Sequence, residues 1–176
     1  MSPMSEDPHL APWRRLGETL AGSFAARARG LLASDFAILD RDGAEVGRLR
    51  IHGPEGAELG AGDLEVRIER VARSRYTMLA GGAEVLASEP AVSPTTLEIR
   101  CSGRLYEARL SLLRNTAEAG PAGGEVAVRI SGGLTNRNYE AVFDIEDEGS
   151  LPVAFFLLYR TVALRREAYR TGPKGS

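Results

Sequence analysis

Two clusters of arginine are the residues of this chain best suited to binding chemistry. A guanidinium group forms paired hydrogen bonds with phosphate or carboxylate, and basic residues beside an apolar segment attract anionic lipid. The clusters therefore predict a ligand-binding surface for an anion or a lipid headgroup. The alternative is a solvated strand face at 67–75 and a solvated tail after residue 160. The residues that we expect to bind are Arg67, Arg70, Arg73, Arg75, Arg165 and Arg166.

Residues that commonly carry out catalysis are sparse. The chain has two histidines, His9 and His52, and one cysteine, Cys101, so a zinc site of standard spacing is not available. It has no P-loop, nucleophile elbow or dinucleotide-binding fingerprint. Cys101 lies in an alternating pattern and is expected to be a small buried residue rather than a nucleophile. We expect a protein that is not an enzyme and that has no catalytic residues, cofactor or bound metal.

Acidic residues gather in two short stretches, 40–42 and 144–148. Carboxylates at this spacing could act as acid and base or hold Ca²⁺. Aspartate also favours turns, because its side chain bonds the nearby backbone. We therefore expect solvated turn carboxylates at Asp40, Asp42, Asp144, Glu146, Asp147 and Glu148.

Composition limits the class of protein. The chain has 176 residues, enough for one domain with a real core. Its formal net charge of -2 argues against a nucleic-acid partner, and Lys174 is the one lysine among 22 basic residues, a bias also expected from a GC-rich gene. The longest apolar run, residues 153–159, is far shorter than the roughly 20 residues that span a bilayer, so the chain is not transmembrane. The start of the chain has no signal-like apolar core, and we expect a cytoplasmic location, peripheral to a membrane if the basic residues bind lipid.

Short alternating segments fill most of the chain from residue 36 to 145. Residues 64–68, for example, alternate apolar and charged side chains, as in a half-exposed strand. Many such strands at hairpin spacing predict an antiparallel sandwich or barrel. The Gly-rich stretches 53–62 and 116–124 are expected to be loops. Residues 12–32 leave two alternatives open: a longer helix weakened by glycines, or a helix to about Gly22 followed by a strand from Ser23 to Arg29.

The apolar run at 153–159 could be a central strand or the start of a buried helix, because periodicity alone does not separate them. Length favours a helix, since the apolar pattern continues to Ala168 and Pro152 suits a first helical turn. A helix that is apolar nearly all round must be enclosed on all sides. A barrel wrapped around it would enclose it.

Two stretches share a strand, an acidic turn with glycine, and a following apolar segment. They are residues 36–43 followed by 46–49, and residues 143–149 followed by 153–154. This order resembles the tubby C-terminal-like superfamily, in its LURP-one-related and scramblase-like branch, over residues 24–164. The resemblance implies a closed antiparallel β-barrel of about a dozen strands around a hydrophobic C-terminal helix. Some members bind phosphoinositide headgroups through basic residues, which implies a lipid site near 67–75. The chain departs from the family at Arg160 and at the charged extension 165–167, where family helices tend to end.

The sequence therefore predicts a mainly β protein with one domain at 12–170, a disordered leader at 1–11 and a disordered tail at 171–176. We expect a non-enzymatic binding module that docks at anionic phospholipid membranes or holds a lipid or other apolar ligand. The alternative is a structural or protein–protein interaction domain without a small-molecule ligand. The expected partner is an anionic phospholipid or an unidentified protein.

Overall fold

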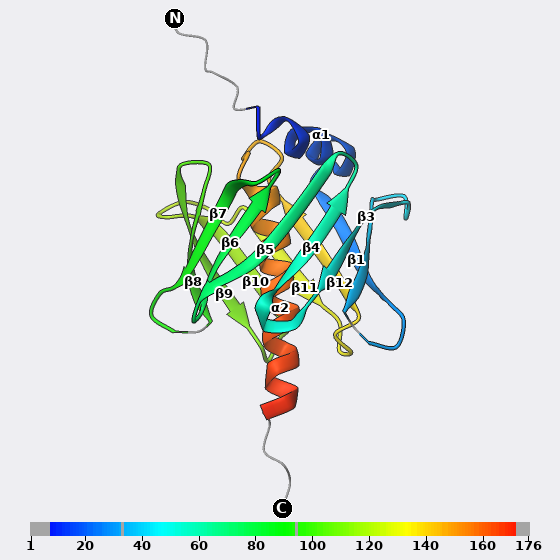
Figure 1. The fold of residues 1–176 in the computed structure, drawn as a ribbon, viewed down its shortest axis with the longest axis vertical. Coiled ribbons are helices and arrows are strands. Elements are labelled where there is room, and N and C mark those ends of the chain that lie inside the picture. Colours follow the sequence, from blue (N-terminus) through cyan, green and yellow to red (C-terminus); the bar gives the residue numbers. More distant parts are fainter. Residues whose placement is uncertain (1–7, 33, 94, 172–176) are drawn as a thin grey trace, which may run out of the picture.

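A closed barrel surrounds one long helix in the computed structural model, which describes residues 8–32, 34–93 and 95–171 (Figure 1). Within these residues twelve antiparallel strands form the barrel, with α1 (Ala11–Leu20) across one end and α2 (Ser150–Thr171) inside it. The strands and one 3₁₀ turn are β1 (Ser23–Arg29), β2 (Asp35–Leu39), β3 (Glu45–Ile51), η1 (Gly53–Glu55), β4 (Gly56–Ala61), β5 (Leu64–Ala72), β6 (Arg75–Ala80), β7 (Ala83–Pro90), β8 (Thr96–Cys101), β9 (Arg104–Ser111), β10 (Thr116–Pro121), β11 (Val128–Gly132) and β12 (Asn138–Phe143). This architecture confirms the predicted barrel and its enclosed helix.

Each strand pairs with the next along the chain, and β1 pairs with β12 to close the barrel. Closure leaves no sheet edge to pair with another chain. Because successive strands alternate in direction, the connections between them lie alternately at two ends. We call the end where α2 begins, covered by α1, the entry end, and the end where α2 leaves the barrel the exit end (Figure 1).

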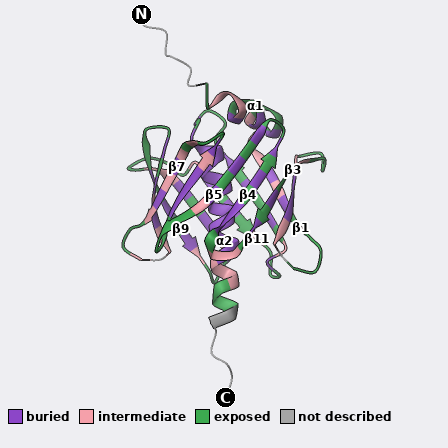
Figure 2. Ribbon diagram, viewed as in Figure 1, coloured by how far each residue is buried: buried purple, intermediate pink, exposed green. Residues whose placement is uncertain are grey.

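Side-chain alternation fills the barrel from the inside. Leu64, Val66 and Ile68 of β5 are buried, whereas Glu65 and Arg67 between them face solvent, and buried and exposed residues alternate along other strands too (Figure 2). Residues 151–158 of α2 are apolar on every face, and the residues from 151 to 163 are all buried. Such burial contributes roughly 25 cal/mol per Å² of apolar surface.

The two alternatives for residues 12–32 are decided in favour of a helix followed by a strand. α1 ends because Ala21 adopts a left-handed conformation (φ 55°) and its N–H caps the carbonyl of Gly17. The chain then continues as β1. The predicted leader lies outside the described residues except for 8–11, where a turn leads into α1, and all of the predicted tail except Thr171 also lies outside them.

Two stretches predicted as loops are strands. Residues 53–62 contain β4 and residues 116–124 contain β10, and each pairs with the strands on both sides of it. Their inward side chains are mostly alanine, including Ala57, Ala117 and Ala119, a residue with low strand propensity. The small side chains have a use in packing, because they let strands approach closely what they surround; β10 is among the strands nearest α2.

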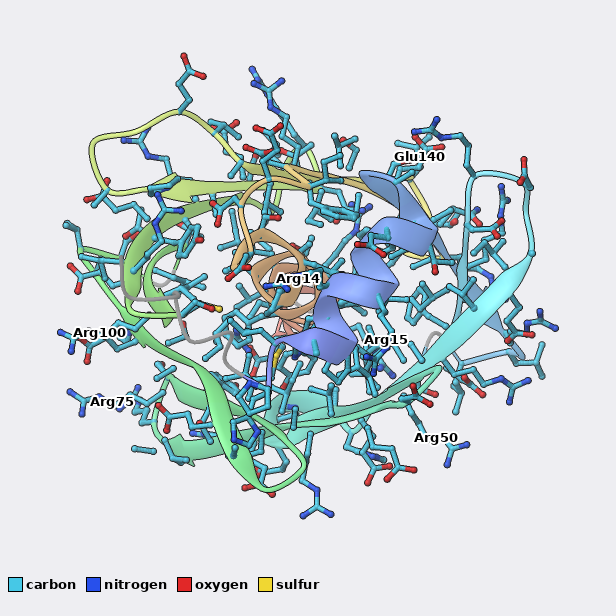
Figure 3. The ribbon with its side chains drawn as sticks, turned by 90° about the horizontal axis from the view of Figure 1, so that it is seen from above. Arg14, Arg15, Arg50, Arg75, Arg100 and Glu140 are labelled. Carbon is cyan, nitrogen blue, oxygen red and sulfur yellow. The ribbon has the colours of Figure 1, made fainter. Side chains whose placement is uncertain are left out.

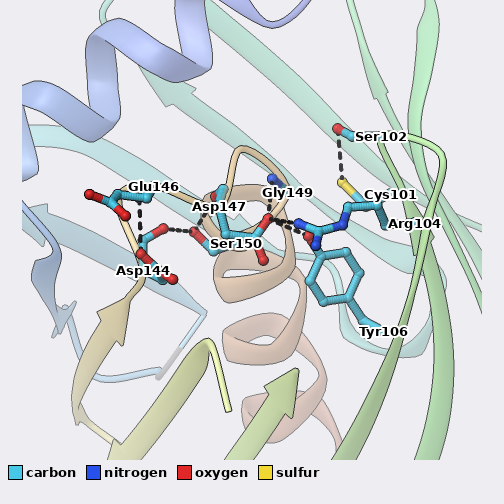
Figure 4. A network of polar contacts seen from close by, with 9 residues as sticks. All are labelled: Cys101, Ser102, Arg104, Tyr106, Asp144, Glu146, Asp147, Gly149 and Ser150. Atoms are coloured by element: carbon cyan, nitrogen blue, oxygen red, sulfur yellow. Dashed lines mark hydrogen bonds and ion pairs between the residues drawn. The ribbon is translucent and has the colours of Figure 1, made fainter. Parts of the chain in front are cut away.

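The beginning of α2 is fixed by one buried carboxylate, that of Asp147 (Figure 4). Its Oδ1 accepts hydrogen bonds from Tyr106 Oη at 2.5 Å, Gly149 N at 3.1 Å and Arg104 Nη1 at 3.2 Å. Ser150 Oγ donates to the carbonyl oxygens of Asp144 and Asp147 at 2.5 and 2.7 Å. The expectation that all the turn carboxylates are solvated was therefore wrong for Asp147, whose burial is compensated by three donors. The other three at 144–148 are exposed, as expected.

Gly149 is required by the close approach of Tyr106. A Cβ atom at position 149 would lie 2.3 Å from Tyr106 Oη and 3.0 Å from the ring atom that carries it. The tyrosine is fully buried and bonded to Asp147, so it cannot move aside without breaking that bond.

We expect Gly149→Ala to destabilise the fold by about 1–3 kcal/mol, because the added methyl group displaces Tyr106 from Asp147. Urea unfolding followed by circular dichroism measures the change. Gly60→Ala is the matched control, since a Cβ atom at exposed position 60 meets nothing within 4 Å. Equal unfolding midpoints for the two variants would contradict the role assigned to Gly149.

Candidate functional site

The exit end of the barrel is formed by six connections and by the emerging part of α2. In the described part of the chain these connections comprise residues 30–32 with 34, 52–55, 73–74, 91–93 with 95, 112–115 and 133–137. Figure 1 shows α2 passing between them and continuing beyond the barrel.

Large aliphatic side chains are strongly exposed on four of these connections. They are Leu31 (99% exposed), Leu32 (72%), Val92 (97%), Leu113 (97%) and Leu134 (93%), and we call them the apolar tips. Scattered exposed hydrophobics are normal in proteins, but these share one end. At the entry end the most exposed large apolar side chain among the described residues is Ile145, at 64%. The two ends of the barrel therefore differ in chemical character.

Two of the tip-bearing connections are held by a buried polar network. Asn115 Nδ2 donates to the carbonyl of Gly133 at 3.0 Å, and Tyr139 Oη donates to Asn115 Oδ1 at 3.2 Å and also contacts Asn136 Oδ1. Both asparagines are buried and have positive φ, a conformation that asparagine tolerates better than most residues. The tips at 113 and 134 are thus held outward by hydrogen bonds behind them.

Arginine dominates the charge around the tips. The six connections carry Arg73, Arg114 and Arg137, and α2 adds Arg165 and Arg166 as it leaves the barrel; the acidic residues on the same segments are Glu55 and Glu167. Some of these arginines also brace the connections. Arg137 Nη2 donates to the carbonyl of Gly30 at 2.7 Å, and Arg165 Nη2 donates to that of Leu134 at 2.7 Å.

A pocket of about 210 Å³ opens beside α2 at this end. Its lining includes Pro54, Arg70, Arg73, Tyr76, Arg160 and Glu167. A second pocket of about 280 Å³, lined by His52 and Arg166 among others, shares Pro54 and Glu167 with the first. Both pockets therefore lie where α2 emerges from the barrel.

Arg160 is the central cation of the first pocket and is only 7% exposed. Its Nη1 donates to Tyr76 Oη at 2.9 Å, and Tyr76 Oη donates to the carbonyl of Pro54 at 2.9 Å. Its guanidinium carbon lies 4.5 Å from the centre of the Tyr76 ring and 5.8 Å from that of Tyr159. Tyr159 Oη in turn donates to the carbonyl of Gly53 at 2.8 Å. These contacts connect α2 to η1 and β6.

The predicted arginine clusters are divided by the fold. Arg70 and Arg73 reach the pocket, Arg166 lines the second pocket, and Arg165 instead donates to Leu134 in the connection between β11 and β12. Arg67 is instead on the outer wall, where it pairs with Glu69 at 3.2 Å, and Arg75 pairs with Glu89 at 3.6 Å and points away from the barrel (Figure 3). Strand alternation explains the division, because a barrel wall turns neighbouring side chains of one strand in opposite directions.

Sequence reasoning did not select Arg160 as a binding residue. The signal was present, because an arginine directly after seven apolar residues in an enclosed helix must leave water with its charge. Its partner Tyr76 is 84 positions away, so the contact itself could not be inferred.

Two larger hollows lie away from the exit end. The outer wall has a shallow hollow of about 690 Å³ between Arg48 and Arg67, and the entry end has one of about 490 Å³ between α1 and residues 143–151. Within the described residues, no group of three or more His, Cys, Asp or Glu side chains is placed to hold a metal ion. No helix in the described part of the chain is both long enough and apolar enough to cross a membrane.

Comparison with known proteins identifies a fold relationship. No protein-family profile matches the chain, and no curated protein matches its sequence. The X-ray structure of the Arabidopsis thaliana protein AT5G01750 is similar, with a TM-score of 0.55 and 13% sequence identity. The match covers 85% of this chain and 93% of the plant protein. At this level of identity the similarity establishes a shared fold and carries no function across.

We expect the fold to lose stability at alkaline pH through its buried tyrosines. Burial raises the pKa of Tyr139 to about 12 and raises the pKa of Tyr159 and of Tyr106 further above its ordinary value. Above about pH 10 the unfolded chain releases phenol protons that the native state retains, so the unfolded state binds fewer protons and stability falls as pH rises. At about pH 11 the Tyr139 contribution to this loss is on the order of 1 kcal/mol.

Urea midpoints from neutral pH to about pH 11 measure this slope. Tyr139→Phe removes one of the groups and should therefore show a shallower fall, whatever its stability at neutral pH. A fall as steep as that of the unaltered protein would contradict the assignment.

Proposed function

We propose that this protein is a non-enzymatic binding module that docks on anionic phospholipid membranes through the exit end of its barrel. The observation that carries the proposal is the placement of the apolar tips and of five arginines on the same end. The tips would enter the lipid, and the arginines would meet the headgroups. Such a module acts at the cytoplasmic periphery of a membrane.

The spacing of the tips favours lipid over a protein partner. The five tips occupy four separate connections, and three of these connections are held by hydrogen bonds from Asn115, Arg137 and Arg165. A protein interface normally has a continuous apolar centre that excludes water. Separate tips suit a bilayer, because each one inserts into lipid without needing its neighbours.

Charge supports the same conclusion. Each basic residue near an anionic leaflet contributes about 1 kcal/mol, and the exit end has five arginines against two glutamates. Docking is also favoured over carrying an apolar ligand inside the barrel, because α2 occupies the interior. A protein-interaction domain is the second candidate, since exposed apolar side chains serve protein partners as well.

The proposal also includes a relationship to a protein superfamily. The twelve-stranded barrel around a C-terminal helix supports placing the chain in the tubby C-terminal-like superfamily, in its LURP-one-related and scramblase-like branch. The acidic turn with glycine at 144–149, on which the resemblance depended, is the segment that positions α2.

Replacing two tips should weaken membrane binding. We expect Leu113→Ser with Leu134→Ser to lower partitioning roughly tenfold or more, because each tip contributes on the order of 1 kcal/mol on entering lipid. Flotation with phosphatidylcholine vesicles containing phosphatidylserine measures it. Ile145→Ser is the matched control at the entry end and should bind like the unaltered protein. If the double variant binds equally well, the exit end is not the docking surface.

Removing charge should change the salt dependence. We expect Arg114→Gln with Arg166→Gln to weaken binding to the same vesicles on the order of tenfold and to flatten its decline with added salt. Arg50→Gln with Arg100→Gln changes the same charge on the outer wall, where both side chains point away from the barrel (Figure 3). An equal loss from both pairs would show that net charge acts without a defined surface. Equal binding to vesicles of phosphatidylcholine alone would overturn the proposal.

A further inference from the structure

We infer that the pocket around Arg160 binds a phosphate monoester, which gives the proposed docking surface a preference for one headgroup chemistry. The inference deepens the proposed function, but its central claim concerns this pocket and is testable without a membrane.

The guanidinium of Arg160 is buried and has no carboxylate partner among the described residues. Taking a guanidinium out of water is costly unless an anion or several acceptors compensate it. Arg160 forms no ion pair with a carboxylate of the described residues, and the neighbouring Tyr159 and Tyr76 offer it uncharged rings and hydroxyl groups. These aromatic contacts offset part of the cost. An anion in the pocket would compensate the remainder.

The guanidinium of Arg160 also has N–H donors that are available to a ligand. A guanidinium carries five N–H donors in a fixed planar arrangement that matches phosphate oxygens. Nη1 of Arg160 donates to Tyr76 Oη, and the Tyr159 hydroxyl also interacts with the guanidinium, so further N–H donors are left for a ligand. Tyr76 is itself fixed by the carbonyl of Pro54, so the guanidinium is held in place before a ligand arrives.

The lining of the pocket has an excess of positive charge. Its lining contains three arginines, Arg70, Arg73 and Arg160, and one carboxylate, that of Glu167, so the lining has a net charge of about +2. A phosphate monoester carries about −1.5 to −2 at neutral pH, whereas a diester carries about −1. Arg70 Nη1 also lies 3.7 Å from Glu55 Oε1. The Glu55 side chain is 75% exposed, so it can turn into solvent and leave Arg70 to a ligand. The lining therefore matches a monoester better than a diester.

The pocket is small and lies at the exit end of the barrel. The volume of about 210 Å³ is below the roughly 300–1,000 Å³ of pockets that enclose a whole small ligand, so a small terminal group fits best. The pocket lies on the same end as the apolar tips. A phosphate group bound there could belong to a free metabolite or to a lipid headgroup standing above the bilayer.

The first arm of the test uses soluble probes at constant ionic strength. Titration calorimetry compares inorganic phosphate and glycerol 3-phosphate with dimethyl phosphate, a diester. We expect inorganic phosphate and glycerol 3-phosphate to bind at least about tenfold more tightly than dimethyl phosphate, because each carries a second negative charge that the diester lacks. Arg73→Gln should weaken glycerol 3-phosphate binding about tenfold, and Glu55→Gln should strengthen it by freeing Arg70. Arg50→Gln is the matched control on the outer wall.

Arg160→Met removes the central charge and should abolish the binding. Position 160 is buried, so this variant is interpreted only if its unfolding midpoint shows a folded protein; the exposed Arg73 and Glu55 variants keep the inference testable without it. Absence of monoester binding, or equal binding by the Arg73→Gln and unaltered proteins, would overturn the inference.

The second arm identifies the source of the phosphate. Vesicles with phosphatidic acid, a monoester lipid, are compared with phosphatidylglycerol vesicles of matched surface charge. Preference for phosphatidic acid that is lost in Arg73→Gln assigns the pocket to a lipid headgroup. Equal binding to both vesicles, with soluble monoester binding retained, assigns it to a free phosphate ester.

The two proposals fail separately. The variant with Leu113→Ser and Leu134→Ser should lose vesicle binding and still bind glycerol 3-phosphate. Absence of monoester binding by the unaltered protein, with binding to phosphatidylserine vesicles intact, would overturn the pocket inference alone.

Discussion

The structure depends on mutual enclosure of a helix and a barrel. A helix that is apolar on every face is stable only where water cannot reach it, and α2 is buried from residue 151 to 163. A barrel of twelve strands has the complementary need, because an eight-stranded barrel is already just wide enough to be filled by its own side chains. Each element therefore supplies the core of the other. The stacking of Phe155 on Phe24, with ring centres 4.5 Å apart, is one place where the two meet.

The two ends of the barrel solve different problems created by this enclosure. At the entry end the chain must turn from β12 into the core, and Asp147, Tyr106 and Gly149 fix that turn while α1 covers it. At the exit end the helix must pass from an apolar interior to solvent. Tyr159 and Arg160 mark the passage, with their polar atoms bonded to groups of the surrounding rim. This polar rim, with the apolar tips around it, makes the exit end the place where the protein offers both charge and exposed aliphatic surface.

Much of the architecture could be predicted from sequence because its signals are strong and local. An unbroken apolar run that continues at helical length indicates an enclosed helix, and strict alternation indicates half-exposed strands. β4 and β10 were missed because glycine and alanine mask the alternation, and their strand conformation depends on neighbours. The break after Leu20 depends on a left-handed alanine, for which the sequence has no marker.

The site was harder to predict because it depends on contacts between distant residues. Clustering selected Arg70 and Arg73, which line the pocket, but it could not separate them from Arg67 and Arg75, which the wall directs elsewhere. In the sequence, Leu113 and Leu134 resemble core residues, since their exposure depends on the network around Asn115 and Tyr139. Burial of Asp147 was missed for the same reason, because Tyr106 lies 41 positions away.

The order of elements has a consequence for biosynthesis. A ribosome releases all twelve strands before it releases α2, so the wall of the barrel exists for a time without its core. During that interval the inward faces of the strands have no helix to cover them, and the pairing of β1 with β12 would close an empty lumen. The nascent chain is therefore expected to need shielding by chaperones until α2 emerges, and termination before residue 150 would release an aggregation-prone sheet with an uncovered inner face.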